Sequence, residues 1–407
     1  MADPIDESAA TPPGGAAVPA GTAVAAGTAA ILLGSAATDA APTGCRCRGC
    51  LAAPAGRPAC AARLQVSALT VSGATITVSG GDPVGIRAGS AIERDGVRVI
   101  GLPAAGGEVA LVLGSPAGTV LWAPTAGPLP EPSLAALAGA GLDVAVLALG
   151  DCATASTGLA RTLARLRRAD AVAADCDVVA VGVRHGDDTT RLGPLLAGWG
   201  ARIAPDGAPL GPAHAAPPRP ALARTLLLGP ASSGKSAVAE AMLAAEPDVD
   251  YLPTGPAPTA DDADWAARIE AHRRRRPPWW STLEGADLAG RLGADGPPLL
   301  VDSLGTWVAE ALQRCGAWDD APRWRDRYDA EVRAVVQGWR QVGRRVVAVG
   351  EETGWGVIPS TSSGRRFREA LGGLTQQLAA ESERVLLVVA GRTVDLGGPD
   401  LPSGGAR

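Results

Sequence analysis

The fold of this chain is decided at residues 229–236, which read GPASSGKS. The stretch fits the pattern G-x-x-x-x-G-K-[S/T], in which glycines allow a tight turn and backbone N–H groups converge on phosphate oxygens. Residues 225–228 predict an apolar strand, and a helix is predicted from 235 to about 245. This order predicts a nucleotide-binding α/β unit, because the helix N-terminus adds partial positive charge. The alternative is a Gly/Ser-rich turn that merely precedes a helix.

Lys235 is the only lysine of the chain, although Lys and Arg together number 37. The other cationic positions hold arginine, as a GC-rich coding background favours. A lysine ammonium is a compact charge on a flexible stem, whereas arginine is a planar fork, so the two are not exchangeable at a phosphate. We expect Lys235 to act in catalysis on the nucleotide phosphates. The expected nucleotide-binding residues of the loop are Gly229, Pro230, Ala231, Ser232, Ser233, Gly234, Lys235 and Ser236.

Two oxygen ligands for Mg²⁺ are expected beside the nucleotide. The Ser236 hydroxyl occupies the metal-binding position of the phosphate loop. Asp302 ends the apolar run PPLLVD at 297–302 and is the natural Walker-B carboxylate. The alternative interpretation of Asp302 is an ordinary aspartate at the end of a strand.

Composition limits the class of protein. The 407 residues predict two or three domains, and 46% apolar residues allow a sizeable core. A net charge of −5 gives no indication of a nucleic-acid partner. No basic region followed by an apolar run marks a secretory signal, and no stretch has the character of a membrane span. We therefore expect a cytoplasmic protein.

The chain divides into two halves of different pattern. The first half has one helical stretch, STGLARTLARLRRADAVA, and short β-like runs separated by glycine-rich turns. The seven runs are LQVSALTVSG, ATITVSG, VRVIGL, EVALVLG, GTVLWAP, DVAVLALG and DVVAVGV. The second half alternates strands and helices, and its apolar runs without alternation predict a mainly parallel sheet covered on both faces. The expected boundaries are a disordered tail at 1–26, a domain at 27–213, a linker at 214–222, a domain at 223–397 and a flexible tail at 398–407.

His272 lies near the end of a helix predicted for DDADWAARIEAHR at 261–273, and four arginines begin at Arg273. A neutral imidazole beside dense positive charge suits attack on a phosphate whose oxygens the arginines bind. The alternatives are a histidine that caps the helix C-terminus and an arginine run that is a solvated face.

Taken together, the motifs of the second half resemble a known family. The similarity covers about residues 224–396 and rests on LLLGPASSGKS, YLPTG, DDADWAARIEAHRRRRPPWWSTLE, LLVDSLGTWV, VVAVGEETGWGVIPSTSSGRRFREALGGL and ERVLLVVAG. These resemble the bifunctional adenosylcobinamide kinase / adenosylcobinamide-phosphate guanylyltransferase family of cobalamin biosynthesis, with a P-loop fold.

That resemblance implies the chemistry. The family phosphorylates adenosylcobinamide from a nucleoside triphosphate, GTP or ATP, and transfers GMP from GTP to the resulting phosphate, which yields adenosylcobinamide-GDP. The transfer passes through a guanylylated histidine, and His272 occupies that place in this chain. The substrates adenosylcobinamide and its phosphate, Mg²⁺ and a homo-oligomer are implied in the same way.

The resemblance also places the loop that carries Glu352, Gly354 and Gly356, where the family usually reads N-E-V-G-x-G-x-V-P, over the active site, so Glu352 is expected there. Arg273 follows His272 as in the family motif. Three positions depart from the family pattern: Glu351 where asparagine is usual, Pro253 where a small residue is usual, and Thr375 where asparagine is common.

The first half resembles a decayed metallo-β-lactamase fold, an αββα-like domain, at LLGSAATDAAPTGCRCRGC, TVLWAPTAGPLP and RHGDDTTRLGPLLAGWGARIAPDG. An active hydrolase of that fold needs a histidine cluster for two metals, and no histidine precedes His185, so no hydrolytic site is expected. Cys45, Cys47 and Cys50 resemble a structural zinc motif, or are three reduced thiols. A fourth zinc ligand would be His185, His214 or Cys60.

Two other functions remain open from sequence. One is a different small-molecule P-loop kinase in which His272 only packs. The other is a scaffold protein that uses the phosphate loop as a nucleotide-dependent switch without covalent chemistry.

Overall fold

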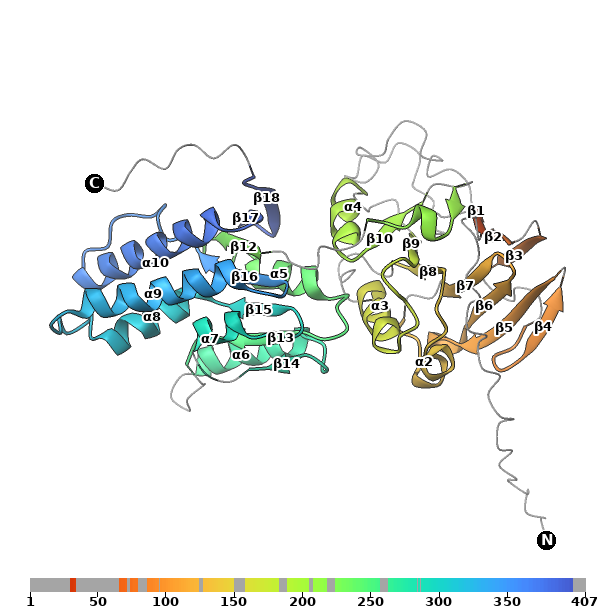
Figure 1. Ribbon diagram of the computed structural model, residues 1–407, viewed down its shortest axis with the longest axis horizontal. Coiled ribbons are helices and arrows are strands. Elements are labelled where there is room, and N and C mark those ends of the chain that lie inside the picture. Colours follow the sequence, from red (N-terminus) through yellow and green to blue (C-terminus); the bar gives the residue numbers. More distant parts are fainter. Residues whose placement is uncertain are drawn as a thin grey trace, which may run out of the picture. The chain divides into compact units, whose positions relative to one another are not determined.

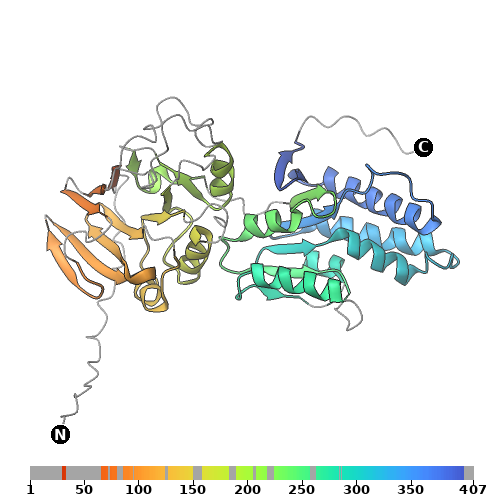
Figure 2. The ribbon, with the colours of Figure 1, turned by 180° about the vertical axis from the view of Figure 1, so that it is seen from behind.

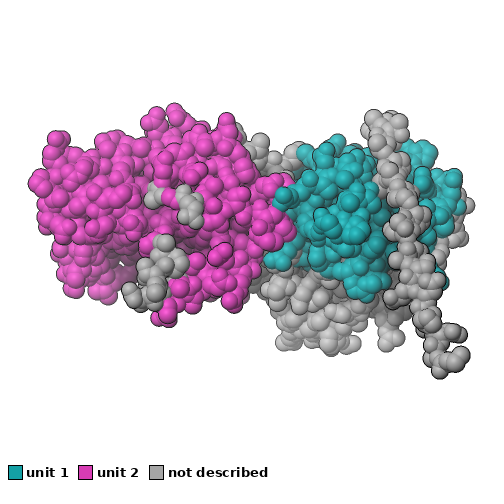
Figure 3. All heavy atoms as spheres, turned by 90° about the horizontal axis from the view of Figure 1, so that it is seen from below, with its two compact units in different colours: residues 1–219 teal, residues 220–407 magenta. Residues whose placement is uncertain are grey.

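A computed structural model of the chain divides it into two compact units, residues 1–219 and 220–407, which Figure 3 colours separately. The division lies inside the segment that the sequence predicts as a linker. The structure describes residues 30–33, 66–71, 74–79, 86–94, 96–123, 127–149, 158–182, 189–204, 208–217, 224–256, 263–283, 285 and 287–397. Each unit is described by itself.

Unit 1 contains a four-stranded and a seven-stranded sheet. The four-stranded sheet is antiparallel, in the order β11-β1-β2-β3. In the seven-stranded sheet, β4 to β7 are antiparallel neighbours and β7 to β10 are parallel. The strands are β1 (Ala30–Leu33), β2 (Val66–Val71), β3 (Ala74–Ser79), β4 (Ala91–Arg94), β5 (Val97–Pro103), β6 (Val109–Ser115), β7 (Gly118–Ala123), β8 (Val144–Ala148), β9 (Asp177–Val181), β10 (Ala201–Ile203) and β11 (Pro209–Leu210).

The seven longer runs expected as strands in this half are all strands, whereas the short strands β4, β10 and β11 were not expected. The helices are α2 (Glu131–Leu137), α3 (Gly158–Arg168) and α4 (Thr189–Gly198), with 3₁₀ turns η1 (Ala105–Gly107) and η3 (Pro212–His214). Of the helices, only α3 was predicted. A mixed α/β unit with two sheets is therefore confirmed.

Unit 2 is built on one sheet in the order β14-β13-β15-β16-β12-β17-β18. All its neighbours are parallel except β17 and β18, which form an antiparallel hairpin. The expected mainly parallel sheet is thus confirmed. The strands are β12 (Arg224–Gly229), β13 (Asp250–Pro253), β14 (Ser281–Thr282), β15 (Leu299–Asp302), β16 (Val346–Glu351), β17 (Arg384–Val389) and β18 (Arg392–Asp395).

Helices cover both faces of this sheet, as the unbroken apolar runs predict. One core joins the sheet to α7, α8, α9 and α10, and a second joins the opposite face to α5. Figures 1 and 2 show α8, α9 and α10 lying side by side. The helices are α5 (Lys235–Leu243), α6 (Ala263–Arg275), α7 (Leu288–Gly293), α8 (Leu304–Cys315), α9 (Trp324–Gln341) and α10 (Ser362–Ala380).

The strand order sets where polar side chains meet. β16 lies between β12, which leads into the phosphate loop, and β15, which ends at Asp302. In parallel sheets the carboxyl ends of neighbouring strands open on one edge, where ligands bind. Within the described residues, no helix is both long enough and apolar enough to cross a membrane.

Candidate active site

The phosphate loop joins β12 to α5 through a turn that requires glycine at two places. A Cβ at Gly229 would lie 2.3 Å from the carbonyl oxygen of Val388, which β17 brings against the loop. Gly234 caps α5 with a φ of 96°, a left-handed conformation that favours glycine. The loop therefore folds as the motif predicts, with its backbone around a tight cradle.

Two side chains of the loop fit a phosphate ligand. Lys235 is buried, and its ammonium donates to the Pro230 carbonyl at 2.8 Å across the turn. The hydroxyl of Ser233 is buried and, among the described residues, has no hydrogen-bond partner. A buried hydroxyl without a partner is costly, and a phosphate oxygen would satisfy it.

Neighbouring strands hold the loop from both sides. The Glu352 N–H, just after β16, donates to the Gly229 carbonyl at 2.9 Å. On the other side, the Gly391 N–H in the β17–β18 turn donates to the Ser233 carbonyl at 2.8 Å. The cradle is thus fixed by the sheet before any ligand binds, which lowers the ordering cost of binding.

Asp302 lies directly against the start of α5. The Ser236 hydroxyl donates to its Oδ1 at 3.2 Å, and the Tyr251 hydroxyl from β13 donates to its Oδ2 at 3.2 Å. Burial alone raises the pKa of this carboxyl, but the hydrogen bond and charge of His272, with the two hydroxyls, lower the pKa below its ordinary value. Burial, followed by the charge of Asp302, raises the pKa of Tyr251, so this phenol stays a neutral donor.

His272 reaches the same carboxylate from α6. Its Nδ1 lies 3.4 Å from Oδ2 of Asp302 and 3.9 Å from Oε1 of Glu240, a buried residue of α5. Its side chain is 18% exposed, so one part of the ring remains accessible. The structure thus brings together Lys235, Ser236, Asp302 and His272, which the sequence places in three separate motifs.

Polar contacts hold the end of α6 in this position. Arg275 donates to both carboxylate oxygens of Glu240, at 2.9 and 3.1 Å. Arg276 lies over the ring of Tyr251, 3.6 Å from its centroid, and its Nε donates to the His272 carbonyl at 3.2 Å. In contrast, Arg273 is exposed, and none of the described contacts links it to the phosphate loop or Asp302.

The loop expected over the site starts beside the phosphate loop, because the Glu352 N–H donates to the Gly229 carbonyl. The Glu352 carboxylate accepts the Gly354 N–H at 2.7 Å. Glu351, which replaces the usual asparagine, accepts the N–H of Gly305 at 2.9 Å in the first turn of α8. A negative charge at a helix N-terminus is favourable there.

The other two departures from the family pattern also have structural places. Pro253 pairs with Asp302 across the β13–β15 ladder and precedes Thr254, whose hydroxyl contacts Thr306 at 2.6 Å. The Thr375 hydroxyl donates to the Leu371 carbonyl at 3.0 Å within α10, so its polar group is satisfied inside the helix.

The donor set fits Mg²⁺ of the kind held by a few protein oxygens and substrate phosphates. Ser236 Oγ and the ionised Asp302 Oδ1 are adjacent, and Mg²⁺ prefers such oxygen ligands. Bound there, the ion would neutralise phosphate charge. No cluster of three or more His, Cys, Asp or Glu suited to a metal occurs in the described part of the chain. Cys45, Cys47, Cys50, Cys60 and His185 lie outside the described residues, and His214 is exposed in η3.

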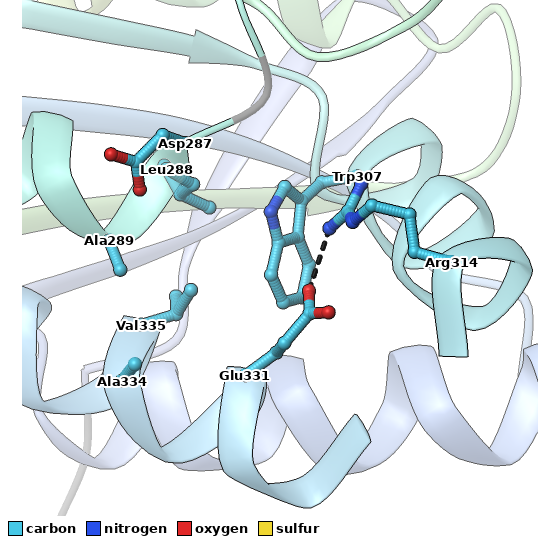
Figure 4. Close-up of a pocket in the computed structure, with 8 residues that line it drawn as sticks. All are labelled: Asp287, Leu288, Ala289, Trp307, Arg314, Glu331, Ala334 and Val335. Atoms are coloured by element: carbon cyan, nitrogen blue, oxygen red, sulfur yellow. Dashed lines mark hydrogen bonds and ion pairs between the residues drawn. The ribbon is translucent and has the colours of Figure 1, made fainter. Parts of the chain in front are cut away.

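A separate hollow of about 460 Å³ lies among α7, α8 and α9, on the sheet face away from α5. Figure 4 shows its apolar floor and the ion pair of Arg314 with Glu331, at 2.7 Å, along its side. None of the residues that line it belongs to the set around Asp302.

Sequence reasoning missed two buried partners of the site, Glu240 and Tyr251. Glu240 contacts the end of α6, and nothing in the sequence of α5 alone indicates that contact. Tyr251 is one of two tyrosines in the chain and stands at a strand's centre, where its hydroxyl needs a partner.

The fold and this set of residues define a P-loop nucleotide-binding protein with a histidine beside the phosphate cradle. The family model of cobinamide kinase / cobinamide phosphate guanyltransferase matches residues 225–396. The chain belongs to this family through its second unit, and unit 1 lies outside the match.

Characterised relatives match over nearly their whole length. The bifunctional adenosylcobalamin biosynthesis protein CobP of Pseudomonas aeruginosa is 39% identical over 184 residues, which are 44% of this chain and 99% of the relative. The CobU proteins of Escherichia coli and Salmonella typhimurium are 35% and 34% identical, each over 41% of this chain and 95% of the relative. Among solved structures, the VirB11 ATPase of Brucella suis gives a TM-score of 0.21 at 10% identity over 82% of this chain and 88% of that chain, too low to carry an argument.

Proposed function

We propose that this protein phosphorylates adenosylcobinamide and transfers GMP from GTP to adenosylcobinamide phosphate through a covalent guanylyl-His272 intermediate. The family of the second unit supports the reaction class. The observation that carries the covalent step is the 3.4 Å approach of His272 to Asp302, whose other oxygen accepts from Ser236 of the phosphate loop.

The contacts of the imidazole favour one nitrogen as the nucleophile. Nδ1 faces Asp302 and Glu240, so it carries the proton and donates it toward carboxylates, and Nε2 keeps the lone pair. In the first step Nε2 bonds to the α-phosphorus of GTP while the bond to the bridging oxygen breaks, and pyrophosphate leaves with that electron pair. The two carboxylates stabilise the positive charge that the ring acquires.

In the second step, an oxygen of adenosylcobinamide phosphate attacks the same phosphorus. The nitrogen–phosphorus bond breaks, and its electron pair returns to Nε2, which restores the neutral ring. The intermediate replaces one difficult displacement with two easier ones. Lys235 and the loop N–H groups bind the charge that builds on the departing pyrophosphate.

The kinase step would use the same cradle. The substrate hydroxyl oxygen bonds to the γ-phosphorus of ATP or GTP, the bond to the β-phosphate oxygen breaks, and the diphosphate leaves; the hydroxyl proton passes to solvent. Lys235 would bind the β- and γ-phosphates, as expected from the motif. Arg275 contacts Glu240 and Arg276 contacts Tyr251, so these arginines position the end of α6 rather than bind phosphate.

Incubation with α-labelled GTP and no corrinoid tests the covalent step. The expected result is acid-labile, base-stable label on His272, attached to Nε2 in the phosphohistidine analysis. A His272→Ala variant is expected to bind GTP and to take up no label. Binding without label in the unmodified protein would favour a plain P-loop kinase or a nucleotide switch, and label on Nδ1 would contradict the orientation of the ring.

The finer expectations from sequence form part of the same proposal. They are the domain bounds 27–213 and 223–397, a metallo-β-lactamase-like origin of unit 1, a structural zinc at its cysteines, a homo-oligomer and a cytoplasmic location. The two-sheet architecture of unit 1 supports its assignment. The contribution of unit 1 to catalysis would be tested by comparing the kinase and guanylyltransferase activities of the full chain with those of a chain that begins at residue 220.

A further inference from the structure

Three neighbouring apolar side chains stand exposed on the loop between β16 and α10. Trp355, Val357 and Ile358 are 65%, 95% and 70% exposed, and they are here called the apolar ridge. Seven large apolar side chains are exposed in the described part of the chain, and three of them fall within these four residues. A concentration of exposed apolar surface commonly marks a binding site.

Two arginines of α10 fix the shape of this loop. Arg368 donates to the carbonyls of Gly356 and Val357, at 3.0 and 3.3 Å, and to that of Gly354. Arg365 donates to the two carbonyls at 359 and 360, at 3.0 and 2.8 Å. Charge-assisted hydrogen bonds to five carbonyls hold the backbone, so the ridge is presented in a set shape.

The ridge begins beside the candidate active site. The N–H of Glu352 donates to Gly229 at the start of the phosphate loop, and Trp355 follows three residues later. Three residues span at most about 11 Å and six at most about 22 Å, so the Cα of Trp355 lies within about 11 Å of that of Glu352, and the Cα of Ile358 within about 22 Å. A substrate with its reactive arm at the nucleotide phosphates would extend its body over this distance.

We propose that the apolar ridge binds a face of the corrin macrocycle of adenosylcobinamide and of its phosphate; this inference rests on the proposed function. The macrocycle is broad and flat, with apolar faces and amides at its rim. Its aminopropanol arm carries the hydroxyl, and later the phosphate, to the nucleotide. The indole of Trp355 offers a flat apolar surface of matching character, with Val357 and Ile358 beside it.

The size of the ridge favours this small substrate over a protein partner. A large aromatic side chain buries about 150–250 Å² and the two aliphatic chains add less, so the ridge offers a few hundred Å². A stable protein interface buries about 800 Å² on each partner. A second copy of this chain is the alternative occupant that the experiment must separate.

The test uses the full chain with Trp355→Ala, Val357→Ser and Ile358→Ser combined. We expect the dissociation constant for adenosylcobinamide, by equilibrium dialysis, and its KM in phosphorylation to rise about tenfold or more. Label uptake by His272 from GTP alone, which needs no corrinoid, and the sedimentation coefficient should stay unchanged. The matched control is Val394→Ser with Leu396→Ser, which removes exposed apolar surface on β18 and should leave all four measurements unchanged.

The other outcomes distinguish a failure of the ridge proposal from a failure of the proposed function. An unchanged dissociation constant overturns the proposal. A changed sedimentation coefficient with unchanged corrinoid binding assigns the ridge to a contact between copies. Absence of label in the unmodified protein contradicts the proposed covalent step and leaves the dialysis comparison as the test of the ridge.

Discussion

One aspartate in each unit has little contact with solvent, but the two have different kinds of hydrogen-bond partner. Asp177, with a side chain 0% exposed, begins β9 and accepts two hydrogen bonds from Arg202, at 2.8 and 2.7 Å, and one from the Gly211 N–H at 3.0 Å. Asp302, with a side chain 10% exposed, ends β15, and its hydroxyl donors are Ser236 and Tyr251.

The difference separates a structural carboxylate from a functional one. The guanidinium of Arg202 neutralises Asp177 and fills its oxygens, so a ligand finds no open acceptor. At Asp302 the hydroxyls are neutral and exchangeable, and a cation can take the place of the Ser236 hydrogen. The two residues also lie at opposite ends of their strands. Asp177 begins β9, whereas Asp302 lies at the carboxyl ends of parallel strands, where ligands bind.

Removal of the charge at Asp302 gives the largest expected effect. In Asp302→Asn, the rate of label uptake from α-labelled GTP should fall about 10²–10³-fold, because charge stabilisation beside the phosphates is lost. The free energy of unfolding should change by about 1 kcal/mol or less, since the amide oxygen still accepts one hydroxyl and the amide N–H group can donate to the oxygen of the other. A large loss of stability at this residue would remove the distinction from Asp177.

Asp177→Asn should produce the reverse pattern. The buried Arg202 contact loses its charged partner, and we expect unit 1 to lose about 3 kcal/mol of unfolding free energy. Denaturant unfolding measures the loss of stability, and label uptake by His272 from the same preparation measures the chemistry. Loss of labelling without loss of stability would show that Asp177 acts in the chemistry.

Glu240→Gln tests whether the position of His272 depends on its second carboxylate. The variant keeps the volume of the side chain but weakens the double hydrogen bond from Arg275, so the imidazole is held less firmly. We expect label uptake to slow by about tenfold, equivalent to about 1.4 kcal/mol, with GTP affinity unchanged. An equal fall in GTP affinity would instead indicate damage to α5 and its phosphate loop.

Glu270→Gln is the matched change on the outer side of α6 and has the smallest expected effect. Glu270 pairs with Arg274 at 3.0 Å, with side chains 48% and 77% exposed. Exposed pairs of this kind contribute about 0.5 kcal/mol or less. Neither thermal unfolding nor labelling should change measurably, and a clear loss of labelling would show that the whole of α6, and not its inner side alone, sets the reaction.

The site was predicted where one local pattern contained the chemistry. The phosphate-loop motif, with Lys235 and Ser236, could be predicted because strand, glycine turn and helix follow one another in sequence. Asp302 could be predicted from the end of an apolar run. Arg273 was predicted beside the phosphates because it follows His272, but one helical position rotates a side chain by about 100°, and Arg275 and Arg276 are the arginines that contact Glu240 and Tyr251.

Elements that depend on contacts were harder to foresee. The short strands β4, β10, β11, β14 and β18 have little pattern of their own, and they exist because a neighbouring strand supplies their hydrogen bonds. Helices α2 and α7 have seven and six residues, too short for a recognisable apolar stripe.

The sequence by itself determined a glycine turn between a strand and a helix that fits the phosphate-loop pattern, the parallel sheet that carries it, and the histidine that is the candidate for covalent chemistry. Those features are local, because each follows from residues within one turn, strand or helix. Only the tertiary structure decided that β16 separates β12 from β15 and that His272 reaches Asp302. It also decided that Glu240 and Tyr251 share in that contact. These distances depend on strand order and helix packing, which sum weak interactions over residues far apart in the chain.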